Sequence, residues 1–159
     1  MKLACLLSGP EIFLTLQGEG PTAGSPAIFI RSSLCNLHCR WCDSDHTWNF
    51  EGTPWPHDKD GSPGYAKHRR EDVQVELDAE DLTERVLAFD CPRLVLTGGE
   101  PLLQQPEWSE LLDLIRSHRP DTRVEVDVAY LGSMKQCRPT LQICIEERAS
   151  RHLHLHVAW

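Results

Sequence analysis

The sequence predicts an α/β fold with a parallel sheet, because three β-forming segments alternate with two amphipathic stretches in the order of βαβ units. The expected strands are residues 27–32, 93–97 and 123–128. The expected helices are residues 78–89 and a second one that begins near Pro106. A chain of 159 residues, of which 40% are hydrophobic, is long enough for one domain with a buried core.

Each expected strand has its own pattern. AIFIRS at 27–32 is typical of a buried strand, RLVLT at 93–97 is a second apolar run, and RVEVDV at 123–128 alternates with a period of two. An apolar extended segment at 11–18 precedes them and runs into a turn, and residues 73–77 alternate briefly.

The helices have recognisable starts. Asp78 is suited to cap the first helix, and Pro106 suits the first turn of the second. Their apolar residues are Leu82, Val86 and Phe89 in the first helix and Trp108, Leu111, Leu112 and Ile115 in the second. Residues 50–70 are rich in Gly, Pro, Asp and His without a period, so we expect a long surface loop there.

Charge and hydropathy exclude several classes of function. The 16 basic and 24 acidic residues give a net charge of −8, which disfavours binding to phosphate backbones, so no nucleic-acid partner is expected. No apolar run approaches the roughly twenty residues of a membrane span, and the run Leu3–Leu7 is shorter than a signal peptide requires. We therefore expect a cytoplasmic protein with no membrane partner.

Three cysteines lie within eight residues. Cys35, Cys39 and Cys42 form a C-x3-C-x2-C pattern, and clustered cysteines in a reducing compartment favour metal binding over disulfides. A structural zinc site needs four ligands, which His38 or His46 could complete. A 4Fe–4S cluster can instead accept three thiolates and leave one iron open to a small molecule. Both centres are compatible with this set of ligands.

Two motifs directly follow expected strands. The cysteine motif begins three residues after the strand at 27–32, and Gly98-Gly99-Glu100-Pro101 closes the strand at 93–97. The carboxyl ends of parallel strands meet at one edge of a sheet, where ligands collect. The sequence therefore predicts one shared site.

The cysteine spacing is typical of the radical S-adenosylmethionine superfamily, and the further motifs resemble the 7-carboxy-7-deazaguanine synthase family. The resemblance covers about residues 10 to 126. The motifs are EIFLTLQGEG at 11–20, PAIFIR at 26–31, CNLHCRWCDS at 35–44, HTW at 46–48 and LTGGEP at 96–101.

The resemblance implies a fold and a division of the chain. We expect a partial (β/α) barrel of the radical S-adenosylmethionine type over residues 1–127, followed by a non-matching tail at 128–159. The family's Glu-Thr-x-Gly motif begins in step at Asp127 but is replaced from Val128 onward. A truncated or frame-shifted product would have such an altered C-terminus. Within the tail, HLHLH at 152–156 alternates like a strand.

The resemblance also implies an activity. The family converts 6-carboxy-5,6,7,8-tetrahydropterin to 7-carboxy-7-deazaguanine with loss of ammonia, a lyase step of queuosine and 7-deazapurine biosynthesis that serves tRNA modification. The implied cofactors are a 4Fe–4S cluster, S-adenosyl-L-methionine and Mg²⁺. An external reductant such as flavodoxin and a homodimer are the implied partners.

Site residues follow from matching positions in the motifs. The cluster ligands are Cys35, Cys39 and Cys42, and Ser44 offers a hydroxyl ligand to Mg²⁺. The residues implied to contact S-adenosylmethionine are Trp41, Cys42, Asp43 and Gly99. The residues implied to contact the pterin are Leu16, Gln17, Gly18, Arg31 and Thr97, with Arg31 on the carboxylate because a planar guanidinium suits two-point contact.

Three other interpretations stay open at this point. The chain could be a non-catalytic zinc or iron–sulfur binding module, or an inactive truncated copy with no centre. Among enzymes the alternative is an activase that makes a glycyl radical, although that class lacks the pairing of LQGEG with Arg31.

Overall fold

A computed structural model describes residues 1–20, 22–128 and 153–157, the last of these through the backbone alone. The strands are β1 (Lys2–Leu6), β2 (Gly9–Pro10), β3 (Ile12–Leu16), β4 (Pro26–Ser32), β5 (Gln74–Glu76), β6 (Arg93–Gly98), β7 (Arg123–Val128) and β8 (Leu153–Val157). The helices are α1 (Arg70–Val73), α2 (Ala79–Leu87) and α3 (Gln105–His118), with short 3₁₀ turns η1 (Asp45–Thr47) and η2 (Pro101–Gln104).

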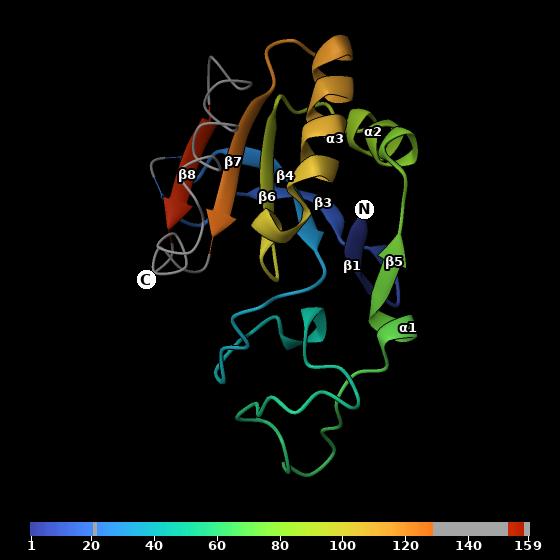
Figure 1. Cartoon of the computed structure of the whole chain (residues 1–159). Coiled ribbons are helices and arrows are strands. Elements are labelled where there is room, and N and C mark those ends of the chain that lie inside the picture. The colour runs from blue at the N-terminus through green and yellow to red at the C-terminus, as the bar shows by residue number, and fades with distance from the viewer. Residues whose placement is uncertain (21, 129–152, 158–159) are drawn as a thin grey trace.

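The α/β class is confirmed, and β4, β6 and β7 pair in parallel as predicted. The sheet runs in the order β2-β1-β4-β6-β7-β8, with β8 parallel to β7 (Figure 1). Three antiparallel strands were not predicted to join it: β3 and β1 pair antiparallel with β4, and β5 pairs antiparallel with β1. The expected parallel sheet is therefore a mixed one.

The core lies between the sheet and the helices α2 and α3, which cover one of its faces (Figure 1). Ile30 of β4 pairs with Leu96 of β6, and both are buried. Leu111 and Ile115 of α3 are fully buried against the same cluster. Each such side chain contributes about 1.5–3 kcal/mol through removal of apolar surface from water.

Both predicted helices form. The side chain of Asp78 accepts a hydrogen bond from the Asp81 N–H at 2.8 Å, so the predicted N-cap of α2 is confirmed. The helix ends at Leu87, slightly before the expected Phe89. In α3 the buried residues include Trp108, as its spacing predicted. Among the described residues, no helix has the length and apolar character needed to cross a membrane.

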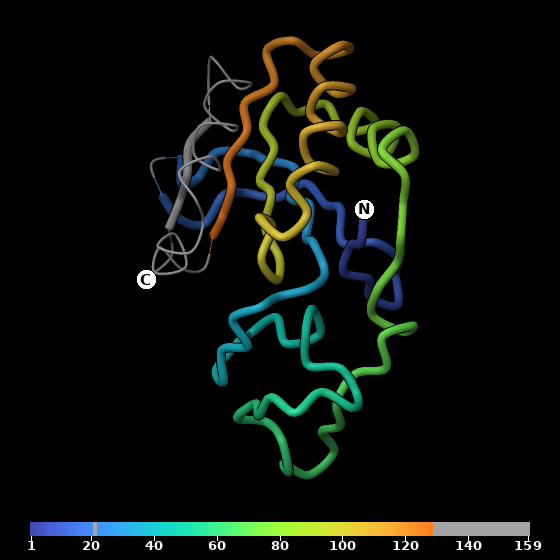
Figure 2. The backbone as a smooth tube through the Cα atoms, viewed as in Figure 1, coloured from blue at the N-terminus to red at the C-terminus, as the bar shows by residue number. Residues whose placement is uncertain are grey.

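Residues 51–69 contain no helix or strand, which confirms the predicted long loop. Together with the cysteine segment this loop extends beyond the carboxyl ends of β4 and β6 (Figure 2). It is more tightly held than a simple surface loop, because buried polar contacts tie it to the cysteine segment. Those contacts are described below.

Candidate functional site

A cavity of about 600 Å³ opens at the carboxyl ends of β4, β6 and β7. Most of the residues predicted to contact substrate or cofactor line this one space, although they come from four separate segments. They are Leu16, Gln17, Gly18, Arg31, Asp43, Ser44, Thr97 and Gly99. Cys35, Cys39, Trp41 and Cys42 belong to the loop beside it and are not among its lining residues; Trp41 is 78% exposed.

Strand register and two glycines bring the motifs together. Arg31 and Thr97 are paired neighbours on β4 and β6. A Cβ on Gly99 would lie 2.1 Å from the Leu34 carbonyl oxygen, and one on Gly98 would lie 2.3 Å from that of Ser32. Only glycine allows this approach, so the Gly98-Gly99 backbone packs directly on the start of the cysteine loop.

Arg31 is held in place by its neighbours. Its Nε donates to Glu11 Oε1 at 3.2 Å, and its Nη1 donates to Ser44 Oγ at 3.1 Å. His46 Nε2 lies 2.7 Å from the other Glu11 oxygen. Burial alone would raise the pKa of Glu11, but the hydrogen bond to His46 and the charge of Arg31 outweigh it and lower that pKa. The guanidinium is thus fixed at the cavity as a cation.

Gln17 is anchored by a buried acid that sequence reasoning missed. Glu125 of β7 is 0% exposed and accepts from Gln17 Nε2 at 3.3 Å, Thr22 Oγ1 at 2.7 Å and Arg93 Nη1 at 2.6 Å. Burial would raise its pKa, yet these donors lower it on balance. The side chain of Gln17 therefore makes its hydrogen bonds to groups of the protein itself, Glu125 and the Gly18 N–H. The signal in the sequence was an acid between two valines on a strand.

An aromatic wall was missed as well. The rings of Phe13 and Phe29 are stacked, with centroids 5.7 Å apart and an interplanar angle of 4°, and both line the cavity. The two residues are cross-strand partners in the β3–β4 register. That pairing would have shown the wall from sequence if the antiparallel register had been known.

The thiols of Cys35, Cys39 and Cys42 are free and share one short loop. The N–H of Leu37 donates to Cys35 Sγ at 3.4 Å, and the Cys42 N–H donates to the Cys39 carbonyl at 3.1 Å. Burial raises the pKa of Cys35 and that of Cys39. Electrostatic repulsion from a neighbouring cysteine of the motif also raises each of these pKa values.

The donor set fits a 4Fe–4S cluster bound through three thiolates. Three soft sulfur ligands on one loop, with a backbone N–H already directed at one of them, are what such a cluster uses. In the described part of the chain, no three His, Cys, Asp or Glu side chains are grouped to hold a single metal ion. A 4Fe–4S cluster would instead take each thiolate on a different iron.

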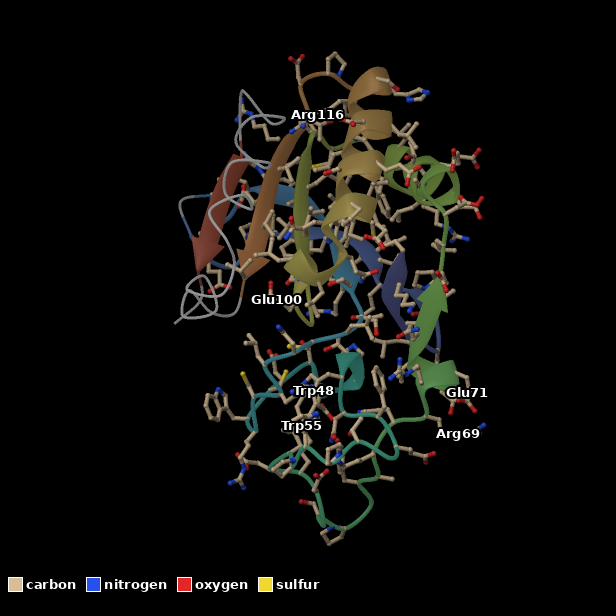
Figure 3. All side chains as sticks on the ribbon, in the orientation of Figure 1. Trp48, Trp55, Arg69, Glu71, Glu100 and Arg116 are labelled. Carbon is tan, nitrogen blue, oxygen red and sulfur yellow. The ribbon has the colours of Figure 1, made fainter. Side chains whose placement is uncertain are left out.

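The two histidines considered as zinc ligands have other partners. His46 contacts Glu11, as described above. The His38 ring stacks on that of Trp55, with centroids 4.6 Å apart, and meets the edge of Trp48 at 5.3 Å. Both tryptophans lie on the loop side of Glu100 (Figure 3). Neither contact places a fourth ligand beside the thiols.

Asp45 joins the long loop to the end of the cysteine segment. This 4% exposed residue accepts from Lys59 Nζ at 2.8 Å, Tyr65 OH at 2.5 Å and His68 Nε2 at 3.0 Å. Burial would raise the pKa of Asp45, but the three donors hold it far below its ordinary value. Burial and the bond to Asp45 raise the pKa of Tyr65 to about 12. We call these four residues the Asp45 cluster.

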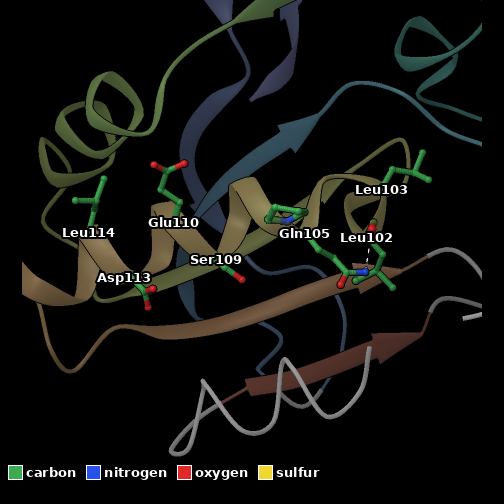
Figure 4. Close-up of a pocket in the computed structure, with 8 residues that line it drawn as sticks. Leu102, Leu103, Gln105, Ser109, Glu110, Asp113 and Leu114 are labelled. Carbon is green, nitrogen blue, oxygen red and sulfur yellow. Dashed lines mark hydrogen bonds between the residues drawn. The ribbon is translucent and has the colours of Figure 1, made fainter. Parts of the chain in front are cut away.

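A second cavity, of about 850 Å³, runs along α3 and contains none of the predicted residues (Figure 4). It is lined by Leu102, Leu103, Gln105, Pro106, Ser109, Glu110, Asp113 and Leu114. The amide of Gln105 donates to the Leu102 carbonyl at 3.1 Å there. The first cavity is the candidate site, because the motifs converge on it.

The tail lies largely outside the described residues. The backbone of β8 continues the sheet, pairing Leu153 with Val124. The segment HLHLH at 152–156 was expected to alternate like a strand, and its histidine side chains belong to the part that the structure does not describe. The proposed division at residue 127 stays a prediction.

Comparisons with known proteins agree with the motifs. A family model described as a 4Fe-4S single cluster domain matches residues 16–144. A 7-carboxy-7-deazaguanine synthase of Escherichia coli is 34% identical over 142 residues, which cover 87% of this chain and 59% of that protein. The synthase of Hyperthermus butylicus is 33% identical over 107 residues, covering 67% and 37%.

The fold has a solved relative. The crystal structure of QueE from Escherichia coli matches with a TM-score of 0.56 and 28% identity, over 81% of this chain and 53% of that one. A synthase of Rhodospirillum rubrum is 40% identical over 95 residues, covering 60% and 32%. The matched part of this chain thus spans about one third to three fifths of the length of these curated relatives.

Proposed function

Because the chain belongs to the 4Fe-4S single cluster domain family, we propose that it binds one such cluster as a radical S-adenosylmethionine lyase. Its proposed reaction converts 6-carboxy-5,6,7,8-tetrahydropterin to 7-carboxy-7-deazaguanine with loss of ammonia. The relatives named as 7-carboxy-7-deazaguanine synthases support the choice of reaction. Its place would be the biosynthesis of queuosine and other 7-deazapurines.

One observation carries the proposal. Most of the residues matched to the family's pterin and cofactor contacts, although they come from the end of β3, from β4, from β6 and from the cysteine segment, line one cavity. A cavity of about 600 Å³ falls within the range of sites for small molecules. Chance placement of isolated motif residues would not bring them to the same space.

In this proposal each wall of the cavity has a task. Arg31, fixed by Glu11, binds the carboxylate of the substrate with its planar fork. The stacked Phe13 and Phe29 give an apolar wall that keeps water from the ring. The backbone at Leu16 and Gly18 would meet the pterin edge. The Gly18 N–H already donates to Gln17 Oε1 at 2.9 Å, and Gln17 is in turn anchored on Glu125.

The cofactors have assigned residues. Cys35, Cys39 and Cys42 would hold the cluster, and the backbone at Gly99 would contact S-adenosylmethionine together with Trp41 and Asp43. When bound, the cluster and S-adenosylmethionine would supply the one-electron chemistry that removes a hydrogen atom from the substrate. The Ser44 hydroxyl would bind Mg²⁺, which prefers few protein oxygens together with water and substrate.

The proposal also covers the electron donor, the oligomeric state, the cellular location and the barrel fold. A reductant such as flavodoxin would supply electrons, and the protein would act as a cytoplasmic homodimer. The sheet would form the partial (β/α) barrel of the superfamily over residues 1–127.

Anaerobic turnover tests the proposal. The chain is reconstituted with iron and sulfide and given S-adenosylmethionine, Mg²⁺, a reductant and 6-carboxytetrahydropterin, and mass spectrometry follows 7-carboxy-7-deazaguanine and 5′-deoxyadenosine. Both products are expected from the wild type and neither from Cys39→Ala. A loaded iron–sulfur centre without either product would indicate a binding module or an inactive copy. A zinc centre, or none, would overturn the cluster assignment.

A further inference from the structure

The long loop reaches the third cysteine through a histidine. His57, which is 4% exposed, lies with its Nε2 2.9 Å from the carbonyl oxygen of Cys42. The motif did not contain this residue, and it stands fifteen positions beyond Cys42. It is a buried titratable group for which the reaction described above has no use.

The tautomer of His57 follows from its second contact. The backbone N–H of Lys59 points at His57 Nδ1 over 3.2 Å, and an N–H can only donate. Nδ1 must therefore be the accepting nitrogen, which leaves the proton on Nε2. Nε2–H then donates to the Cys42 carbonyl, so both ring nitrogens are satisfied by a neutral imidazole.

The ring is itself held from several sides. The His57 N–H donates to Asp60 Oδ2 at 2.9 Å, and Asp60 Oδ1 accepts from Asn49 Nδ2 at 3.3 Å. The ring meets the edge of Trp48, with centroids 5.8 Å apart. Lys59 and Tyr65, which lie on either side of Asp60 in the chain, both donate hydrogen bonds to the Asp45 carboxylate.

These contacts join the long loop to the cysteine segment at two places, Cys42 and Asp45. The segment leaves β4, carries the three thiols and enters η1 at Asp45. The Asp45 cluster fixes the far end of the long loop to η1, and His57 returns from that loop to Cys42. The carbonyl of the third cysteine is thereby bonded to a residue whose position is set independently of the thiols.

We propose that His57 is a positioning residue for the cysteine loop, holding the Cys42 carbonyl so that the third thiol stays placed for the cluster. The inference rests on the proposed function insofar as the centre is an iron–sulfur cluster. Residues that orient metal ligands typically change metal affinity about 10- to 100-fold when they are lost. The expected effect is on retention of the cluster.

Two substitutions with amide side chains, His57→Gln and His57→Asn, distinguish the effect of losing the hydrogen bond to Cys42 from the effect of losing the imidazole ring. In His57→Gln the amide nitrogen can reach the place of Nε2 and still donate to Cys42. In His57→Asn the amide reaches only the place of Nδ1. His57→Leu is a third variant, which fills the space without any donor and serves if His57→Asn does not fold. Asp58→Ala is the matched control, because it removes an exposed ion pair with Arg40 between the same two segments.

The first readout is loss of iron to a chelator from the reconstituted full chain. We expect His57→Asn and His57→Leu to lose iron about 10- to 100-fold faster than wild type. His57→Gln and Asp58→Ala should stay near wild type. Equal retention by wild type, His57→Asn and His57→Leu would overturn the inference while leaving the proposed function intact.

The second readout needs no cluster. Hydrogen–deuterium exchange of the metal-free chain should show faster exchange over residues 39–49 in His57→Asn and His57→Leu, with His57→Gln close to wild type. If the wild type binds no cluster, the proposed function fails and exchange alone decides this inference. Unchanged exchange in every variant would then reject it.

Discussion

Arg31 Nη1 donates to Ser44 Oγ across 3.1 Å, so the arginine at the end of β4 is bonded directly to the segment that carries the cysteines. The same guanidinium pairs with Glu11 at 3.2 Å through Nε. A residue assigned to the substrate carboxylate and one assigned to Mg²⁺ are therefore neighbours. Binding of the two ligands should be coupled through this contact.

Replacing Arg31 tests the carboxylate site. Arg31→Gln should lower kcat/KM about 10- to 100-fold, because a hydrogen bond to a charged group is worth about 1.5–3 kcal/mol. Titration of the loaded protein with 6-carboxytetrahydropterin should show the loss as weaker binding. Arg69→Gln, at an exposed ion pair with Glu71, is the control and should bind as wild type does. Unchanged binding by Arg31→Gln would show that Arg31 serves only its pair with Glu11.

Regular periodicity made the central elements predictable. The apolar run of β4, the alternation of β7 and the Asp78 cap of α2 are local signals, and each element formed within a few residues of its expected place. The antiparallel strands β1 and β5 depend on pairing between residues seventy or more positions apart, for which the sequence holds no local signal.

The residues of the candidate site also fall into those that the sequence could predict and those that it could not. Motif residues such as Thr97 and Gly99 could be located, because their spacing is specific. The supporting residues could not: Glu125 contacts Gln17 across 108 positions, and His57 contacts Cys42 from a loop without a period. Side chains that support a site are selected by the surrounding fold rather than by a motif.

Gly99 should tolerate no side chain. In Gly99→Ala the new Cβ would lie 2.1 Å from the Leu34 carbonyl oxygen, which is backbone and cannot turn away. We expect a loss of about 1–3 kcal/mol in the free energy of unfolding, the usual cost of overpacking. Urea unfolding measures it. Gly18→Ala is the control, because its Cβ would meet nothing within 4 Å. Equal stability of the two variants would contradict the close approach.

Glu125 should stabilise the fold at neutral pH. Glu125→Leu leaves Arg93 without its buried partner and should cost about 3–5 kcal/mol at pH 7. The folded-state pKa of Glu125 lies below its ordinary value of about 4.5, so its contribution is complete above that pH and is lost as the pH falls through the folded pKa. The stability gap between wild type and Glu125→Leu should therefore narrow below about pH 4.5.

Urea unfolding of both proteins at pH 7, 5, 4 and 3 checks this dependence. Asp81→Asn, which removes an exposed acid of α2, is the control for the loss of one negative charge. A gap that stayed constant down to pH 3 would mean that folding does not lower the pKa of Glu125.

Tyr65 reports on the Asp45 cluster in alkaline solution. Its pKa is raised to about 12 by burial and by the bond to Asp45, so the neutral phenol stabilises the fold below pH 10 and that stability is lost as the pH rises toward 12. Absorbance near 295 nm, taken as the difference between wild type and Tyr65→Phe, isolates this residue from Tyr130. In Asp45→Asn the carboxylate is gone, and the Tyr65 step should move down toward pH 10. A wild-type step already at pH 10 would show that the cluster does not hold the phenol, and with it the long loop, against the cysteine segment.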